Sequence, residues 1–265
     1  MHPVLFRIGT FEVGTYGLIL ALGFFAAMAL AQRQAKLDGI PGEAVSDLAM
    51  TVLLAGLAGS RILYIVVELV KGTPASEVFS LGMLRAAGAV HGGILGALAA
   101  FLWRSKKLGL RLGVTGDALV PATALGQAIG RLGCLMAGCC YGTACEQPWA
   151  IRFTSADAYR ISGTPLYHPL HPVQLYTFAA NLLVMGLLLG LRPRRRFEGQ
   201  LLGAYFVLEG LARIFVETWR GDGDRGFLFN ISWLSTGRAT ALLFVAIGFT
   251  LAFFLKRAAA KPQEA

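Results

Sequence analysis

Charged residues are scarce in this 265-residue chain. Only 15% of the residues are Asp, Glu, Lys or Arg, whereas 55% are hydrophobic, and the mean hydropathy is +0.61. A soluble domain of this length needs more charge than that to cover its surface. The composition therefore excludes both one large and two small soluble domains.

Signals for cleavage, lipid attachment and repetition are also missing. Arg7 and Glu12 give no cationic start of a signal peptide, and the first apolar run is too long for the core of one. Neither end carries a lipidation motif, and the chain shows no internal repeat or low-complexity segment. We therefore expect no cleaved signal peptide and a single domain over residues 1–265.

Long apolar runs, by contrast, are abundant. Runs of about 18 to 25 residues are long enough to cross a bilayer as helices. About seven such helices are predicted, at residues 14–31, 47–70, 86–103, 114–133, 173–191, 200–219 and 237–255. Pro121 should kink the fourth, which membrane helices tolerate when neighbours satisfy the freed carbonyl. The predicted fold class is an all-α polytopic membrane protein.

The net charge of +9 is concentrated in short basic clusters between the apolar runs, as at residues 103–107 and 192–196. Because these clusters flank membrane-length segments, they favour contact with anionic lipid headgroups over nucleic acid. Thirteen Lys and Arg lie in the loops and ends of one side and seven in those of the other. This bias predicts an N-terminus outside and a C-terminus in the cytoplasm. The irregular loops 134–172 and 221–236 then lie on the outer side, with a short strand expected at 149–154.

Four arginines remain within or at the ends of the predicted spans: Arg61, Arg131, Arg213 and Arg238. Each costs about 3 kcal/mol at the bilayer centre on insertion scales, and more without a partner. They must therefore face the interior of the bundle, an aqueous cavity or an anion. Small residues at helical spacing, such as Gly88, Gly92 and Gly96, or Gly126 and Gly130, are explained sufficiently by close helix packing.

The sixth predicted span carries a stripe of alternating charge. Glu209, Arg213, Glu217 and Arg220 fall on one face of the helix. One interpretation is a self-neutralising ladder of ion pairs. The other is a surface for an amphiphile with an anionic headgroup, because a guanidinium stays charged and presents paired donors to phosphate oxygens. With Arg131 beside Gly130 and Gly133, the second interpretation predicts a phosphate site between the fourth and sixth spans.

His91 and the four cysteines leave several readings open. His91, next to two glycines, is either a hydrogen-bonded structural residue or a proton acceptor. The cysteines crowd residues 134–145, in a spacing that is not a common zinc or cluster pattern. An outer-side location permits a disulfide; free packing residues are the main alternative, and a metal site is the least favoured.

Taken in order, these residues resemble the prolipoprotein diacylglyceryl transferase family. The resemblance covers nearly the whole chain. Its markers are Tyr16-Gly17, Gly59-Ser60-Arg61, His91-Gly92-Gly93, Gly130-Arg131-Leu132-Gly133, Gly138 to Gly142, His171 to Tyr176, Arg213, Glu217, Arg220 and Thr236-Gly237-Arg238.

The resemblance implies a multi-pass enzyme of the bacterial inner membrane that functions in lipoprotein biosynthesis, without metal or cofactor. Such an enzyme transfers the diacylglyceryl group of phosphatidylglycerol to the lipobox cysteine thiol of a prolipoprotein signal peptide. A thioether forms and glycerol phosphate is released. Catalytic roles then go to His91, Arg131 and Arg213. Substrate contacts go to Tyr16, Arg61, Gly130, Gly142, Glu209, Glu217, Arg220 and Arg238.

This sequence departs from the family pattern near the expected site. Cys134 and Ala137 stand where asparagines are usual, and Cys139 stands where a glutamate is usual. Glu209 replaces a tyrosine and Arg238 a glutamine, and these two residues offer a substitute charge pair. A divergent paralogue, or a membrane protein that binds or transports phospholipid without this acceptor, is therefore the alternative function.

Overall fold

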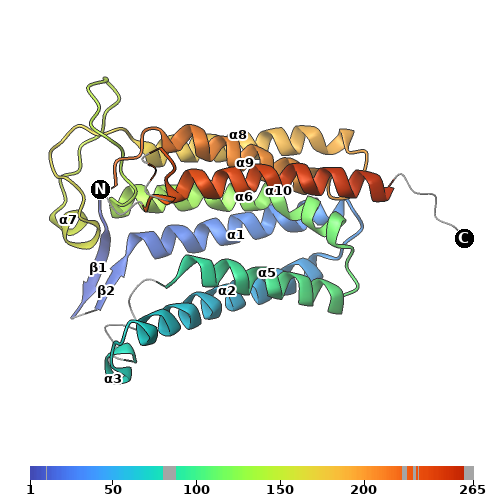
Figure 1. The fold of residues 1–265 in the computed structure, drawn as a ribbon, viewed down its shortest axis with the longest axis horizontal. Helices are drawn as coiled ribbons and strands as arrows, with labels where there is room; N and C mark the ends of the chain where they lie inside the picture. The colour runs from blue at the N-terminus through green and yellow to red at the C-terminus, as the bar shows by residue number, and fades with distance from the viewer. Residues whose placement is uncertain (10, 80–87, 223–225, 229–230, 232, 260–265) are drawn as a thin grey trace, which may run out of the picture. The chain divides into compact units, whose positions relative to one another are not determined.

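The structure, a computed structural model, describes residues 1–9, 11–79, 88–222, 226–228, 231 and 233–259 (Figure 1). The chain divides into two units. One comprises residues 1–31 and 116–265, and the other residues 32–115. Parts of the expected third span (86–87) and of the loop 221–236, which was expected on the outer side, lie outside the described residues.

The smaller unit is built on helices α2 (Gly42–Val70) and α5 (Val90–Lys107), with a single turn, α3 (Ala75–Val78). Glycines bring the two long helices close together. A Cβ added to Gly92 would overlap the carbonyl oxygen of Gly59, and one added to Gly96 would overlap that of Ala55. The prediction that this glycine stripe packs against a neighbouring helix is confirmed.

The larger unit contains a short antiparallel hairpin, β1 (Val4–Ile8) and β2 (Phe11–Gly14). Its helices are α1 (Thr15–Lys36), α6 (Leu112–Ala137), α7 (Ala156–Ser162), α8 (Val173–Leu191), the 3₁₀ turn η1 (Arg192–Arg194), α9 (Gln200–Glu217) and α10 (Thr236–Ala259). In Figure 1, α6, α8, α9 and α10 run side by side. No pattern in the sequence predicted the hairpin.

Helix α6 packs against several neighbours at once. Buried side chains of α6, α8 and α9 form one apolar cluster, made of Val120, Ala124, Val184, Leu188, Leu201 and Tyr205. On another face of α6, a Cβ at Gly126 would lie 3.3 Å from the Cβ of Ala27 on α1. Helix α10 packs along α9, where a Cβ at Gly210 would lie 2.7 Å from Val245. Small residues thus set the close contacts of this bundle as well.

In the described part of the chain, seven helices have 18 residues or more, at the seven places expected. Five of them, α1, α2, α6, α8 and α10, are long and apolar enough to cross a membrane. The other two carry more charge: α5 ends with Arg104, Lys106 and Lys107, and α9 contains its charged stripe. The chain is therefore a mostly helical, multi-pass membrane protein, whereas seven spans and the orientation remain predictions.

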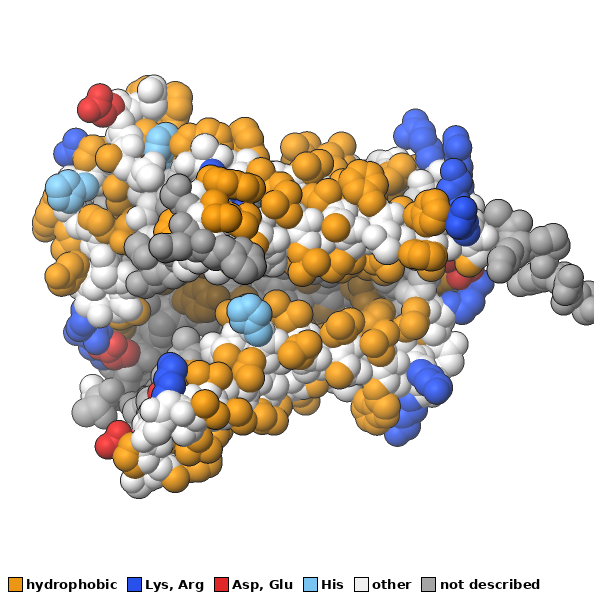
Figure 2. Space-filling view, viewed as in Figure 1, with side chains coloured by type: hydrophobic (Ala, Val, Ile, Leu, Met, Phe, Trp, Pro, Cys, Tyr) orange, Lys and Arg blue, Asp and Glu red, His pale blue; other side chains and the backbone are white. Residues whose placement is uncertain are grey.

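The surface of the larger unit suits a lipid environment. Large apolar side chains such as Leu183, Phe215 and Phe249 are more than 60% exposed along the helices, and Figure 2 shows this apolar surface. Lys and Arg side chains gather where α8 and α10 finish (Figure 2). Apolar flanks that end in basic residues are typical of helices that contact lipid tails and headgroups.

The long loop 134–172 is irregular, as expected, but isolated β-bridges between its own segments hold it in place. Ile151 pairs with Leu170, and Phe153 pairs with Leu166. The expected strand at 149–154 is therefore reduced to isolated pairings. Phe153 itself is fully buried, which explains the apolar positions of that segment.

Candidate functional site

Helices α6 and α9 lie side by side and run in the same direction. The Asp117 carboxylate, near the start of α6, accepts the backbone N–H groups of Gly199 and Leu202, both at 2.9 Å. Further along, the Tyr205 hydroxyl donates to Gln127 Oε1 at 3.0 Å. These contacts set the register of the two helices. The next turn of each helix carries a charged side chain.

That next turn brings Arg131 of α6 and Glu209 of α9 to the same level. The two side chains interact electrostatically, and Arg213 acts on Glu209 as well. Arg131 is half-buried, and among the described residues no acidic oxygen lies within ion-pair distance of it. The Glu209 Oε2 atom is buried without a hydrogen-bond partner in the same part of the chain. Buried polar groups normally have partners, so this interface retains binding capacity for a polar group.

At the end of α9 the charges are paired. Glu217 is 2% exposed, and its carboxylate lies 3.2 Å from Arg213 and 3.9 Å from Arg220. The Ser235 hydroxyl donates to the other oxygen at 2.9 Å. A Cβ at Gly237 would come within 2.7 Å of this carboxyl group. The ion-pair ladder therefore exists for Arg213 and Glu217, and it orients the guanidinium of Arg213.

The loop after α6 is joined to the end of α9 by backbone contacts. Gly142 forms an antiparallel bridge with Arg220, and the Arg220 Nε atom donates to Asp222 at 2.9 Å. Gly142 has no room for a side chain, because a Cβ would overlap the carbonyl oxygen of His171 and lie 2.8 Å from Val173. Close approach of three segments thus requires glycine at this position.

The cysteines near this loop are all free thiols. Cys134, Cys139 and Cys140 form a cluster, with sulfur atoms within 4.8 Å of one another, whereas Cys145 is outside it. The pKa of the Cys139 thiol is raised because its S–H group hydrogen-bonds to Cys134 and Cys140. The pKa of Cys140 is lowered because Cys134 and Cys139 hydrogen-bond to its thiolate, with Arg220 and Arg131 adding to the effect.

Comparison with known proteins decides the family. The family model for prolipoprotein diacylglyceryl transferase matches residues 3–254. A Clostridium tetani phosphatidylglycerol–prolipoprotein diacylglyceryl transferase is 32% identical over 249 residues, which cover 94% of this chain and 95% of the relative. A Vibrio vulnificus enzyme of the same name is 32% identical over 254 residues, 95% of this chain and 90% of its own. A Finegoldia magna enzyme, also of that name, is 28% identical over the full length of both.

The chain belongs to the prolipoprotein diacylglyceryl transferase family. Other positions that the family pattern selected fall in the larger unit. Tyr16 packs against α6, where a Cβ at Gly133 would lie 3.0 Å from its ring. A Cβ added to Gly130 would lie 3.8 Å from the Leu20 side chain of α1. Arg238, one of the family departures, donates to the Trp233 carbonyl at 2.8 Å and forms no ion pair with Glu209 among the described residues.

Two family positions, His91 and Arg61, belong to the smaller unit. His91 is exposed in the first turn of α5. Arg61 on α2 lies over the Tyr64 ring, 5.9 Å from its centroid. Their participation in one site with Arg131 and Arg213 therefore remains a prediction.

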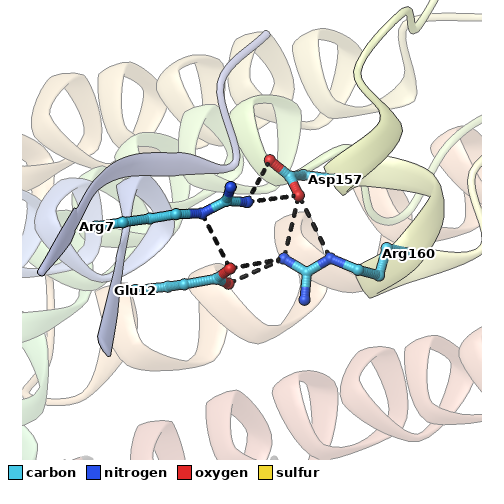
Figure 3. A network of polar contacts seen from close by, with 4 residues as sticks. All are labelled: Arg7, Glu12, Asp157 and Arg160. Atoms are coloured by element: carbon cyan, nitrogen blue, oxygen red, sulfur yellow. Dashed lines mark hydrogen bonds and ion pairs between the residues drawn. The ribbon is translucent and has the colours of Figure 1, made fainter. Parts of the chain in front are cut away.

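Sequence reasoning missed a charged network that fixes the hairpin of this transferase-family chain (Figure 3). Arg7 of β1 lies 3.1 Å from Glu12 of β2 and 3.0 Å from Asp157 of α7. Arg160 of α7 closes the ring with ion pairs of 2.9 Å to Glu12 and 3.1 Å to Asp157. The two pairs that join the hairpin to α7, Arg7–Asp157 and Glu12–Arg160, are 150 and 148 positions apart in the sequence, so no local pattern signals this junction.

An aromatic group in the same unit was also missed. The Trp149 indole N–H donates to the Tyr176 hydroxyl at 2.8 Å, and His171 Nδ1 lies 3.1 Å from the same oxygen. The Trp219 ring packs against Tyr176 at 5.8 Å between centroids. His171 and Tyr176 come from a family marker, so the spacing His-Pro-x-x-x-Tyr was the available signal. The structure shows that this marker joins the loop 134–172 to the end of α9.

Proposed function

We propose that this chain transfers the diacylglyceryl group of phosphatidylglycerol to the lipobox cysteine thiol of prolipoprotein signal peptides. The thiol sulfur bonds to the glyceryl carbon, the carbon–oxygen bond to phosphate breaks, and glycerol phosphate leaves. The enzyme acts in the bacterial inner membrane with its N-terminus outside and without a metal or cofactor in the reaction. Its relatives carry this activity in their names, and the family match extends over almost the entire chain.

The observation that carries the proposal is Arg131, which lies half-buried beside the charged stripe of α9 and has no acidic oxygen within ion-pair distance in the described part of the chain. A cation in a bundle that contacts lipid needs an anion, and the phosphodiester of a phospholipid supplies one. Arg213, oriented by Glu217, completes a pair of guanidinium groups. Together they hold the phosphodiester and stabilise the charge that develops as the leaving group departs.

The remaining predicted residues take supporting roles. His91 accepts the thiol proton or orients the headgroup. Residues that contact the substrate or position those that do are Tyr16, Arg61, Gly130, Gly142, Glu209, Glu217, Arg220 and Arg238. Glu217 fits a positioning role because its carboxylate already has Arg213, Arg220 and Ser235 as partners.

The test is transfer by purified protein in phosphatidylglycerol-containing micelles to a peptide with a lipobox cysteine, measured as a mass increase of the peptide. Arg131→Gln should lower the rate about 100-fold, because removing one preorganised charge donor at a transition state has this size. Arg194→Gln, an exposed member of the basic cluster after α8, serves as matched control and should keep the rate. Equal rates for the two variants would refute the role of Arg131.

A second function has specific support in Cys134, Ala137 and Cys139, which replace the amide and carboxylate groups usual in the family. On this alternative the chain binds or moves phospholipid without using the lipobox acceptor. Protein that retains bound phosphatidylglycerol, loses it on Arg131→Gln, and never modifies the peptide would favour the alternative. Complementation of a strain that lacks its transferase separates the two functions in cells.

A further inference from the structure

Three thiols gather where α6 ends. Cys134 lies in the last turn of the helix, and Cys139 and Cys140 follow in the loop. Cys134 is buried and the other two are half-buried, so the group is largely shielded from solvent, but a small ion can reach it. The three sulfur atoms lie within 4.8 Å of one another. Thiolates are preferred ligands of soft and borderline cations such as zinc.

The backbone holds this group in place. Gly138 and Cys140 both adopt left-handed conformations, with φ of 82° and 56°. For a residue with a side chain, such as Cys140, this conformation costs about 1–2 kcal/mol. The Gln174 amide donates to the Cys139 carbonyl and the Thr164 hydroxyl to the Gly138 carbonyl, both at 2.8 Å. The turn that assembles the thiols is therefore fixed from outside the cluster.

We propose that Cys134, Cys139 and Cys140 form a binding site for one thiophilic divalent cation of the zinc class. A zinc–sulfur bond of about 2.3 Å in tetrahedral geometry separates its sulfur ligands by about 3.8 Å. The sulfur atoms are already within 4.8 Å of one another, so each pair closes by about 1 Å or less. Binding forms three metal–sulfur bonds, and each thiol that still carries a proton loses its S–H bond and releases that proton to solvent. Water takes the fourth position.

The surrounding charge favours the bound form. Arg131, Arg213 and Arg220 all interact electrostatically with the Cys140 thiol. A divalent cation with three thiolates carries one net negative charge, which these guanidinium groups stabilise. Neutral thiols gain nothing comparable from three cations. The site is additional to the proposed transfer reaction, which assigns no step to a metal.

Metal binding is tested on the full-length protein, reduced in detergent and equilibrated with Cd²⁺ or Zn²⁺. One metal per chain is expected by mass spectrometry of the eluted protein, with cadmium–thiolate absorption and a release of protons on binding. Cys134→Ser, Cys139→Ser and Cys140→Ser should each weaken binding at least tenfold. Cys145→Ser is the matched control, since this buried thiol lies outside the cluster, and should bind as the parent does.

Several results overturn the proposal. These are metal content well below one per chain, equal binding by the Cys140→Ser and Cys145→Ser variants, or a disulfide between two of the three thiols in protein isolated without metal. All these readouts are independent of lipid transfer. A chain that binds metal but fails to modify the lipobox peptide would refute the proposed function alone. A chain that modifies the peptide but takes up no Cd²⁺ or Zn²⁺ would refute the metal site alone.

Discussion

Removal of the Asp117 carboxylate should strongly destabilise the larger unit. Asp117 is 0% exposed, and it accepts the N–H groups of Gly199 and Leu202 at the start of α9. The first N–H groups of a helix have no partner within it, so Asp117 caps α9 from a neighbouring helix. Asp117→Ala leaves one buried and one part-buried N–H donor without a charged acceptor, at about 1.5–3 kcal/mol each. Arg195, 3.3 Å away and 23% exposed, regains water and adds less than about 1 kcal/mol.

The expected loss in the free energy of unfolding is thus about 3–6 kcal/mol, a large fraction of a typical total of about 5–15 kcal/mol. Unfolding in mixed micelles with increasing dodecyl sulfate, followed by circular dichroism, measures it. Asp117→Asn keeps one acceptor oxygen and should lose about half as much. Asp47→Ala, which breaks a part-exposed pair with Arg104, is the control and should lose under about 1 kcal/mol. An Asp117→Ala variant no less stable than this control would refute the capping argument.

Three further substitutions test other contacts. Gly92→Val should separate α2 from α5, because a Cβ there already overlaps the α2 backbone, and it should lower the free energy of unfolding in the micelle assay by about 1–3 kcal/mol. Gly142→Ala should reduce transfer to the lipobox peptide, because the new Cβ meets the His171 backbone, whereas Gly186→Ala, with open space around it, should not. Arg160→Ala should lower the free energy of unfolding only slightly in the same micelle assay, and the difference should disappear at about 1 M salt because its ion pairs are exposed.

The long helices were predictable because bilayer thickness fixes how long an apolar run must be. Their ends were not. Helix α1 was expected at 14–31 but continues to Lys36, and α10 was expected at 237–255 but continues to Ala259. A helix can continue beyond the apolar part of a bilayer. Basic residues in the last turn of α1, Arg33 and Lys36, stabilise this extension because they interact favourably with the helix dipole.

The charged stripe of α9 was also predictable, since it follows from helical spacing alone. Which of its members form ion pairs could not be predicted, because the surroundings of Glu217 are shaped by Ser235, just before α10, and by Gly237 in its first turn. Contacts between distant segments could not be predicted, because no local sequence pattern marks them. Asp117 and Leu202 are 85 positions apart, and Arg7 and Asp157 are 150 apart.

The cluster of three thiols could not be predicted from the spacing of the cysteines. Common metal patterns place two ligands across one short turn of regular geometry, and Cys134-x4-Cys139-Cys140 does not fit that form. Spacing rules assume, however, that the chain between ligands follows a standard turn. Here the helix ends at Ala137, and left-handed residues at Gly138 and Cys140 reverse the chain within three positions. That reversal is recorded in backbone angles, and it brings together three thiols that the linear pattern separates.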